Sequence, residues 1–528
     1  MDDPFADAWL AANCKTADNV CTRSIDNYLR LQFNSTKMTT RIETKGSGVF
    51  NERRLEYTFD LDYFPVRSDS GKQIGSASVF GYVADVPDEE RVRRPVTFVF
   101  NGGPGASSAF LHLSGIGPKR IAFPEDLSAG ARPPYAIEES VHSYFDVSDL
   151  VFIDPVNTGY GRTVSDTEID ALYSLEGDAR YFGAIVRAWL AREGRWNSPK
   201  YILGESYGTH RAPFLASALM GFDCVPLDGI ILLGQALNVQ ETMERPGNVC
   251  GAIAGLPVKA VTAWYHGIGA QAYSSADEVV DAALEFAFGE FASALMKGNR
   301  LSESERTEIA EKLERLTGIP AKTYTRHRLC LGKERFRNEL FSERRLVVGV
   351  TDSRYLGVAV DDSVGEAPFE PDYVQILPAY TSGINCYLGQ TLGIGHETEY
   401  RLVDPQATPR WDWSDTGSKN FMQMGKPSPF ETYPYVARLT QFMKQVPHAR
   451  LFIGTGIYDT LTTIGAVEHL LRQYELPLER VTERRYPAGH LMYTDRLACE
   501  QLNRDLRRFV TDSAVHGERP ASDAPCAR

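Results

Sequence analysis

The chain contains one G-x-S-x-G motif, Gly204-Glu205-Ser206-Tyr207-Gly208. It follows the apolar segment 201–203 and opens a helical segment, the strand–turn–helix context in which such a motif presents its serine above a sheet. Glycines two residues to either side avoid collisions in the sharply bent backbone. The motif predicts Ser206 as a nucleophile, and the alternative is a glycine-flanked structural turn.

A glycine-rich loop could stabilise the negative charge that nucleophilic attack creates. Asn101-Gly102-Gly103-Pro104-Gly105 directly follows a predicted strand at 95–100, where an α/β hydrolase places its oxyanion loop. Backbone N–H groups of Gly103 and Tyr207 would then converge on a carbonyl oxygen. A phosphate-cradling loop is the rival interpretation, but the chain lacks a Walker lysine and a G-x-G-x-x-G pattern here.

A serine nucleophile needs a base and an acid, which in this fold follow it in the order Ser, Asp, His. His490 lies in a loop after the predicted strand 481–486, late in the chain. Asp459 follows the predicted strand 451–453 and therefore stands between Ser206 and His490. A lone loop aspartate is usually a turn former, and its position in the order is what favours catalysis.

The elements that must position these residues alternate between strands and helices. Period-2 patterning over 54–63 and 76–86, with a turn at 68–72, predicts an antiparallel hairpin at the sheet edge. Short apolar strands at 96–100, 150–153, 201–203 and 229–233 then alternate with helices, including a long one near 167–193. This alternation predicts an α/β fold, a mainly parallel sheet with helices on both faces.

The strand–helix rhythm stops near Arg245 and resumes near residue 431. Residues 258–316 are helix-rich and predict a helical cap, whereas 321–426 is irregular and rich in Pro and Gly. We therefore divide the chain into an N-terminal extension (1–50), a first core part (51–244), a cap or insertion region (245–430), a second core part (431–512) and a C-terminal tail (513–528).

Composition limits the class of partner. The 528 residues carry 56 basic and 69 acidic side chains, a net charge of −13, which disfavours nucleic acid and anionic membrane surfaces. No apolar run approaches the roughly 18 residues that span a bilayer. The acidic N-terminus does not resemble a secretory signal, so we expect a cytoplasmic protein, or an exported one if this is a mature form. Cys14 and Cys21 could then form a disulfide.

Several segments together resemble the serine carboxypeptidase family, peptidase family S10, and in particular its bacterial branch. The resemblance rests on FNGGPGASS, LVFIDPVNTGYGRT, RWNSPKYILGESYGTHR, TAWYHG and GHLMY. It implies an α/β-hydrolase fold with a helical insertion, a Ser206/His490/Asp459 triad and an oxyanion hole at Gly103 and Tyr207. It requires no metal or organic cofactor.

The resemblance also implies a site for the C-terminal carboxylate of a peptide, made by Asn101, Gly102 and Glu205. A carboxyl group donates a hydrogen bond to another carboxylate only when it is protonated. Eukaryotic members of the family carry a second glutamate where this chain has Gly115. The substitution predicts either a poor carboxypeptidase or a side chain from the cap that replaces the missing acid.

The function predicted from these residues is hydrolysis of peptides or related acyl substrates through an acyl-enzyme. The alternative is acyl transfer to an amine or alcohol on the same scaffold, and the triad residues do not separate the two. A catalytically silent binding protein is disfavoured because every predicted site position is filled. The sequence leaves open whether the chain forms a homodimer.

Overall fold

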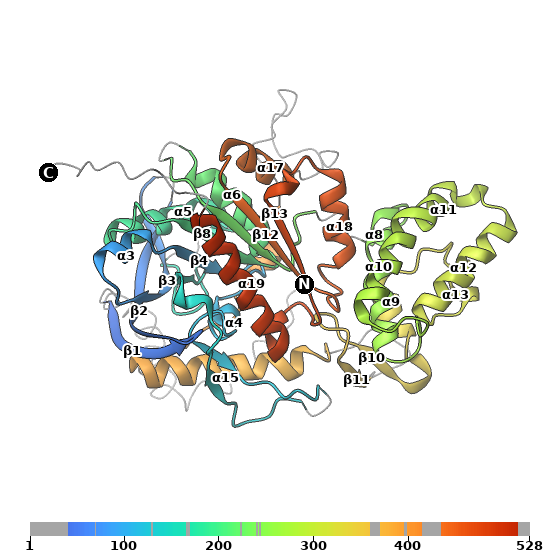
Figure 1. Cartoon of the computed structure of the whole chain (residues 1–528), viewed down its shortest axis with the longest axis horizontal. Helices are drawn as coiled ribbons and strands as arrows, with labels where there is room; N and C mark the ends of the chain where they lie inside the picture. The colour runs from blue at the N-terminus through green and yellow to red at the C-terminus, as the bar shows by residue number, and fades with distance from the viewer. Residues whose placement is uncertain are drawn as a thin grey trace, which may run out of the picture. The chain divides into compact units, whose positions relative to one another are not determined.

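A computed structural model describes residues 41–68, 70–127, 130–164, 169–221, 224–238, 241, 244–358, 370–394, 399–413 and 435–515 (Figure 1). Residues 43–528 form one compact unit. Cys14, Cys21 and residues 516–528 of the expected tail lie outside the described residues. Within those ranges no helix is long and apolar enough to cross a membrane.

One sheet of nine strands organises the molecule, in the order β1-β2-β3-β7-β4-β8-β9-β12-β13. The hairpin predicted from period-2 patterning is confirmed: β2 (Arg53–Arg67) and β3 (Gln73–Ala84) pair antiparallel. The Ser68 N–H donates to the Lys72 carbonyl across the turn. β1 (Ile42–Phe50) adds one more strand outside this hairpin, inside the segment expected to be an N-terminal extension.

The rest of the sheet is parallel. Its strands are β4 (Val96–Phe100), β7 (Asp149–Ile153), β8 (Lys200–Glu205), β9 (Gly229–Leu233), β12 (Arg450–Gly456) and β13 (Val481–Tyr486). β3 joins β7 antiparallel. Because parallel strands end at the same edge of a sheet, the loops after β4, β8, β12 and β13 meet there.

Helices cover both faces of this sheet (Figure 1). Ile202 of β8 belongs to a core cluster with side chains of α5 (Leu175–Arg192), α6 (Gly208–Leu219) and α17 (Tyr435–Gln445). The neighbouring Tyr201 instead contacts Phe509 of α19 (Arg496–Val515), with ring centroids 6.0 Å apart. Successive strand residues point to opposite faces, so α19 covers the face opposite α5 and α6. The predicted α/β class is confirmed.

The cap region contains a helical cluster with one apolar core of its own and a second that it shares with Ile457, Tyr458 and Ile464 of the second core part. Its helices are α8 (Val249–Ala254), α9 (Leu256–Tyr265), α10 (Ala276–Phe286), α11 (Ala292–Lys297), α12 (Glu303–Thr317), α13 (Ala321–Arg326) and α14 (Lys333–Glu339). α18 (Ile464–Gln473) of the core contacts α8 and α9. The Thr463 hydroxyl donates to the Ala254 carbonyl at 3.0 Å and joins core to cap.

The expectation that 321–426 is irregular is wrong in part, because α13, α14 and a longer helix lie within this range. α15 (Tyr373–Leu392) is a 20-residue helix that packs against α4 (Ala109–His112) and β5 (Lys119–Ile121). Its buried side chains recur at helical spacing, at Ile376, Tyr380, Ile384 and Leu388. Pro378, Gly383 and Gly389 obscured that spacing, because they lower helix propensity.

Smaller elements complete the described chain. They are α3 (Asp88–Arg93), α16 (Ala407–Arg410), β6 (Ile137–Glu139), which pairs with β5, and the antiparallel pair β10 (Leu346–Val348) and β11 (Leu356–Val358).

Candidate active site

The loop between β8 and α6 is a strained elbow that carries Ser206. Ser206 has φ +57°, in the left-handed region that side-chain-bearing residues rarely adopt. A Cβ atom on Gly204 would lie 2.2 Å from the Gly208 carbonyl oxygen, and one on Gly208 would lie 3.0 Å from the Phe100 carbonyl oxygen. Steric crowding therefore explains why both flanking positions are glycine.

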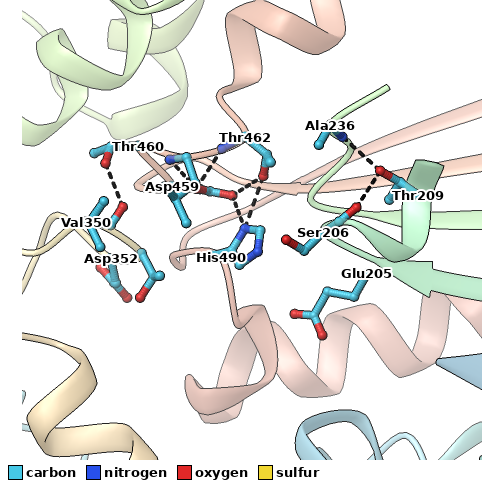
Figure 2. A network of polar contacts seen from close by, with 12 residues as sticks. Glu205, Ser206, Thr209, Ala236, Val350, Asp352, Asp459, Thr460, Thr462 and His490 are labelled. Atoms are coloured by element: carbon cyan, nitrogen blue, oxygen red, sulfur yellow. Dashed lines mark hydrogen bonds and ion pairs between the residues drawn. The ribbon is translucent and has the colours of Figure 1, made fainter. Parts of the chain in front are cut away.

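Asp459 and His490 come together at the same sheet edge, after β12 and β13. The His490 Nδ1 atom lies 2.6 Å from Asp459 Oδ2, and both side chains are buried. The other carboxylate oxygen accepts hydrogen bonds from the backbone N–H groups of Leu461 and Thr462, at 2.7 and 3.0 Å. These bonds hold the carboxylate in place against the imidazole (Figure 2).

Asp459 and His490 shift each other's pKa in opposite directions. Burial penalises the charged imidazolium, but Asp459 outweighs that penalty and raises the pKa of His490 above its ordinary value. Burial likewise raises the pKa of Asp459, and the adjacent His490 more than reverses that effect and lowers it. Asp459 therefore stabilises an imidazolium at His490, which is the species formed when the ring accepts a proton.

Ser206 and His490 meet at the end of β9. The Ser206 N–H donates to the Leu233 carbonyl at 3.0 Å, and a Cβ atom on the next residue, Gly234, would lie 2.9 Å from His490 Cε1. Figure 2 shows the Ser206 side chain directed toward the His490 ring. The structure therefore brings together all three residues predicted from their order in the sequence.

Two residues near the triad had no sequence signal. The Thr462 hydroxyl donates to Asp459 Oδ2 and lies 3.1 Å from His490 Nδ1. The backbone N–H of His490 donates to the carbonyl of Thr351, in the cap region, at 2.6 Å. Thr462 therefore holds the ring, and Thr351 holds the backbone of His490.

The glycine-rich loop after β4 lies directly on the elbow. A Cβ atom on Gly102 would lie 2.4 Å from the Tyr207 nitrogen and 2.9 Å from the Ser206 Cβ atom. Only a glycine permits this approach. Gly103 follows with φ +104° and is exposed. The two backbone donors predicted for an oxyanion hole, Gly103 and Tyr207, thus belong to loops in contact with each other.

A buried ion pair ties these two loops together. Arg211 Nε donates to Asp178 Oδ2 at 2.7 Å, and the Tyr207 hydroxyl donates to the same oxygen at 3.0 Å. A second guanidinium nitrogen of Arg211 donates to the Asn101 carbonyl at 2.8 Å. The pair is fully buried, so it holds the elbow and the glycine-rich loop at a fixed separation. No local pattern in the sequence predicts this ion pair.

Glu205 is a buried acid beside the predicted triad. It is 1% exposed, and burial raises its pKa from 4.5 to about 7. Asn101 donates its side-chain amide to Glu205 Oε2, and the Tyr493 hydroxyl lies 2.8 Å from the same oxygen. Below pH 7 Glu205 is therefore mostly a neutral acid that can donate a hydrogen bond to an anion.

The position of the missing second glutamate is tightly packed and has a backbone conformation that favours glycine. Gly115 has φ +89°, and a Cβ atom there would lie 3.0 Å from both Cys499 Sγ and Ser140 Oγ. Any partner of Glu205 in binding an anion must therefore come from elsewhere in the chain. No cluster of three or more potential metal ligands occurs among the residues that the structure describes.

The fold and the position of the site at the strand ends define an α/β hydrolase. A crystal structure of Kex1(Δ)p, a prohormone-processing carboxypeptidase from Saccharomyces cerevisiae, matches with a TM-score of 0.52. The match covers 86% of this chain and 92% of that chain at 13% sequence identity. At this identity the likeness concerns the fold alone.

Sequence comparison narrows the class. Residues 70–224 match the family model described as serine carboxypeptidase. Serine carboxypeptidase-like 33 of Arabidopsis thaliana is 29% identical over 167 residues, which are 30% of this chain and 32% of that protein. A pheromone-processing carboxypeptidase kex1 of Sclerotinia sclerotiorum is 31% identical over 122 residues, 23% of this chain and 17% of that protein.

These matches support the serine carboxypeptidase family, peptidase family S10, as predicted from the motifs. The family-model match covers the segment that carries the glycine-rich loop and the elbow. The chain matches about a third or less of the length of these curated relatives. The relatives are plant and fungal proteins, so they do not support the predicted bacterial branch.

Proposed function

We propose that this protein is a serine carboxypeptidase-like hydrolase that cleaves peptides or related acyl substrates through an acyl-enzyme. The observation that carries the proposal is the convergence at one sheet edge of a serine on a strained elbow and a buried His–Asp pair. Of the described residues, no other group combines these features with an adjacent glycine-rich loop. The family match to residues 70–224 points to the same chemistry.

The mechanism follows from the roles that these side chains can play. Neutral His490 takes the proton of the Ser206 hydroxyl as Ser206 Oγ attacks the substrate carbonyl, and Asp459 stabilises the resulting imidazolium. The N–H groups of Gly103 and Tyr207 bind the oxygen of the tetrahedral intermediate. His490 then gives its proton to the leaving amine, and water releases the acyl group by the same steps in reverse.

Covalent labelling tests the nucleophile without knowledge of the natural substrate. A fluorophosphonate probe should label the wild-type chain at Ser206, and Ser206→Ala should lose labelling. Asp459→Asn should slow labelling by about 10²- to 10⁴-fold while the chain stays folded, because the amide cannot hold the ring in the correct tautomer. Labelling of the Ser206→Ala protein, or an unchanged rate in a folded Asp459→Asn protein, would refute the assignment.

The fate of the acyl group separates hydrolysis from acyl transfer. With a peptide or ester substrate, hydrolysis predicts free acid as the main product even when amines or alcohols are added. A product that consists mainly of the amide or ester of the added acceptor would assign the chain to the acyltransferases instead.

A further inference from the structure

One loop of the inserted region lies against the two loops that carry Asp459 and His490. It consists of residues 350–354, between β10 and β11, and we call it the brace loop. Figure 2 shows Val350 and Asp352 of this loop beside Asp459 and His490. A segment that is distant from both loops in the sequence therefore borders the predicted triad.

The brace loop bonds to the Asp459 loop on both sides of the acid. The Thr460 hydroxyl donates to the Val350 carbonyl at 2.6 Å. The Ser353 N–H donates to the Tyr458 carbonyl at 3.0 Å. The residues directly before and directly after Asp459 are thus both held by the same five-residue segment.

The His490 loop is held by the same segment. Its first contact is the bond from the His490 backbone to the Thr351 carbonyl described above. In addition, Arg354 Nη1 donates to the Pro487 carbonyl at 2.9 Å. A Cβ atom on Gly489 would lie 2.5 Å from the Thr351 carbonyl oxygen, so the two backbones are in close contact. The brace loop therefore links the Asp459 loop to the His490 loop.

Two buried charged side chains hold the brace loop in shape. Asp372, at the start of α15, accepts at one oxygen the N–H groups of Thr351 and Asp352, at 2.6 and 3.0 Å. Arg354 Nη2 donates to Asp352 at 2.7 Å, and its Nη1 atom lies 3.1 Å from Asp495 of the core. Asp372 is fully buried and the Arg354 side chain is 7% exposed. Because loss of one buried partner leaves the other charge uncompensated, these contacts are costly to break.

The position of the two loops relative to each other decides whether the imidazole meets its carboxylate. The contacts of the brace loop reach the backbone of both loops, so they act on placement. A misplacement of about 1 Å at reacting groups can slow a reaction by about 100-fold. Loosening the brace loop is therefore expected to slow the chemical step more than it weakens binding.

We propose that Arg354 and Asp372 are positioning residues, which act through the brace loop to set the position of His490 against Asp459. The inference rests on the proposed function and goes beyond it. It makes the inserted region necessary for the cleavage step, although the residues proposed for cleavage all lie outside that region.

Labelling kinetics test the proposal. The maximal rate of fluorophosphonate labelling at Ser206 and the probe concentration that gives half of this rate are measured separately, per folded chain. Arg354→Gln and Asp372→Ala should each lower the maximal rate by about 10- to 100-fold and leave the half-saturating concentration nearly unchanged. Asp372→Asn keeps an acceptor oxygen for the brace loop, so it should recover most of the rate that Asp372→Ala loses.

A spectroscopic signature separates positioning from a general loss of stability. The proton between His490 and Asp459 should give a far-downfield NMR resonance in the wild type, which Asp459→Asn removes. In folded Arg354→Gln this resonance should shift or broaden. Arg335→Gln is the matched control, because Arg335 forms an exposed ion pair with Glu339 in the same inserted region. It should change neither the rate nor the resonance.

Three outcomes would overturn the inference. They are wild-type maximal rates in folded Arg354→Gln and Asp372→Ala, an equal loss of rate in Arg335→Gln, and an Asp372→Asn protein as slow as Asp372→Ala. Failure of the proposed function would appear separately, as a wild-type protein that the probe does not label.

Discussion

Glu205 is an acidic residue that is both buried and next to Ser206. In the proposed function it must also bind an anionic substrate. Burial permits this binding by raising its pKa to about 7, so the group is neutral in mildly acidic solution. The surrounding donors, Asn101 and Tyr493, keep it oriented in either protonation state.

The raised pKa of Glu205 makes stability depend on pH. Between pH 4.5 and 7 the folded state binds more protons at Glu205 than the unfolded chain does, so this group lowers stability as pH rises through that window. We expect Glu205→Gln to raise the free energy of unfolding by roughly 1 to 3 kcal/mol at pH 8 and to change it little at pH 4.5. Urea unfolding of variant and wild type at the two pH values measures the difference.

Glu138→Gln is the control for that experiment, because Glu138 is exposed on β6. It should show no such pH dependence. A Glu205→Gln protein whose stability relative to wild type is the same at both pH values would contradict a buried, ionisable Glu205.

At the scale of elements, the sequence predicted those whose pattern is local. The strands β4, β7, β8, β9 and β12 contain short apolar runs, and the elbow appears as two glycines around one serine. Contacts between distant elements have no such pattern. The Arg211–Asp178 pair and the contact of Thr462 with Asp459 depend on the tertiary fold, which the local pattern of a single sequence does not predict. Tyr493 stood within a quoted motif, but nothing local assigned it a partner.

The crowding at the elbow predicts that Gly204 cannot be replaced by a residue with a side chain. Gly204→Ala would place a Cβ atom 2.2 Å from the Gly208 carbonyl oxygen, a backbone atom that cannot yield. We expect a loss of about 2 to 4 kcal/mol in the free energy of unfolding, or failure to accumulate soluble protein. Gly289→Ala meets nothing within 4 Å and should be neutral or stabilising by up to about 1 kcal/mol. Similar stability of the two variants in denaturant titrations would show that the elbow is less strained than described.

At the scale of the whole molecule, one lysine connects the cap to the sheet edge that carries the predicted triad. Lys333 of α14 is buried and donates its ammonium group to the carbonyl of Thr460, the residue after Asp459. Its own backbone N–H donates to Glu244. A substitution of Lys333 in the cap would therefore alter the hydrogen bonding of the loop that carries Asp459.

Lys333→Met tests this connection, because methionine keeps an apolar stem of similar length and removes the ammonium donor. It should lower the free energy of unfolding by about 1 to 3 kcal/mol, since the buried Thr460 carbonyl loses its donor, and should also slow fluorophosphonate labelling of Ser206. Lys322→Met, at an exposed position of α13, should change neither quantity. Wild-type labelling and stability in Lys333→Met would mean that the cap and the triad act independently.

The position of α15 in the chain has a practical consequence for protein engineering. The residues proposed for bond cleavage come from loops after β4, β8, β12 and β13, whereas α15 lies within the inserted stretch between β9 and β12 and packs against α4 and β5. Mutant libraries confined to 373–392 would therefore vary one packed helix while the residues proposed for cleavage stay unchanged. Folded members of such libraries should keep fluorophosphonate labelling of Ser206.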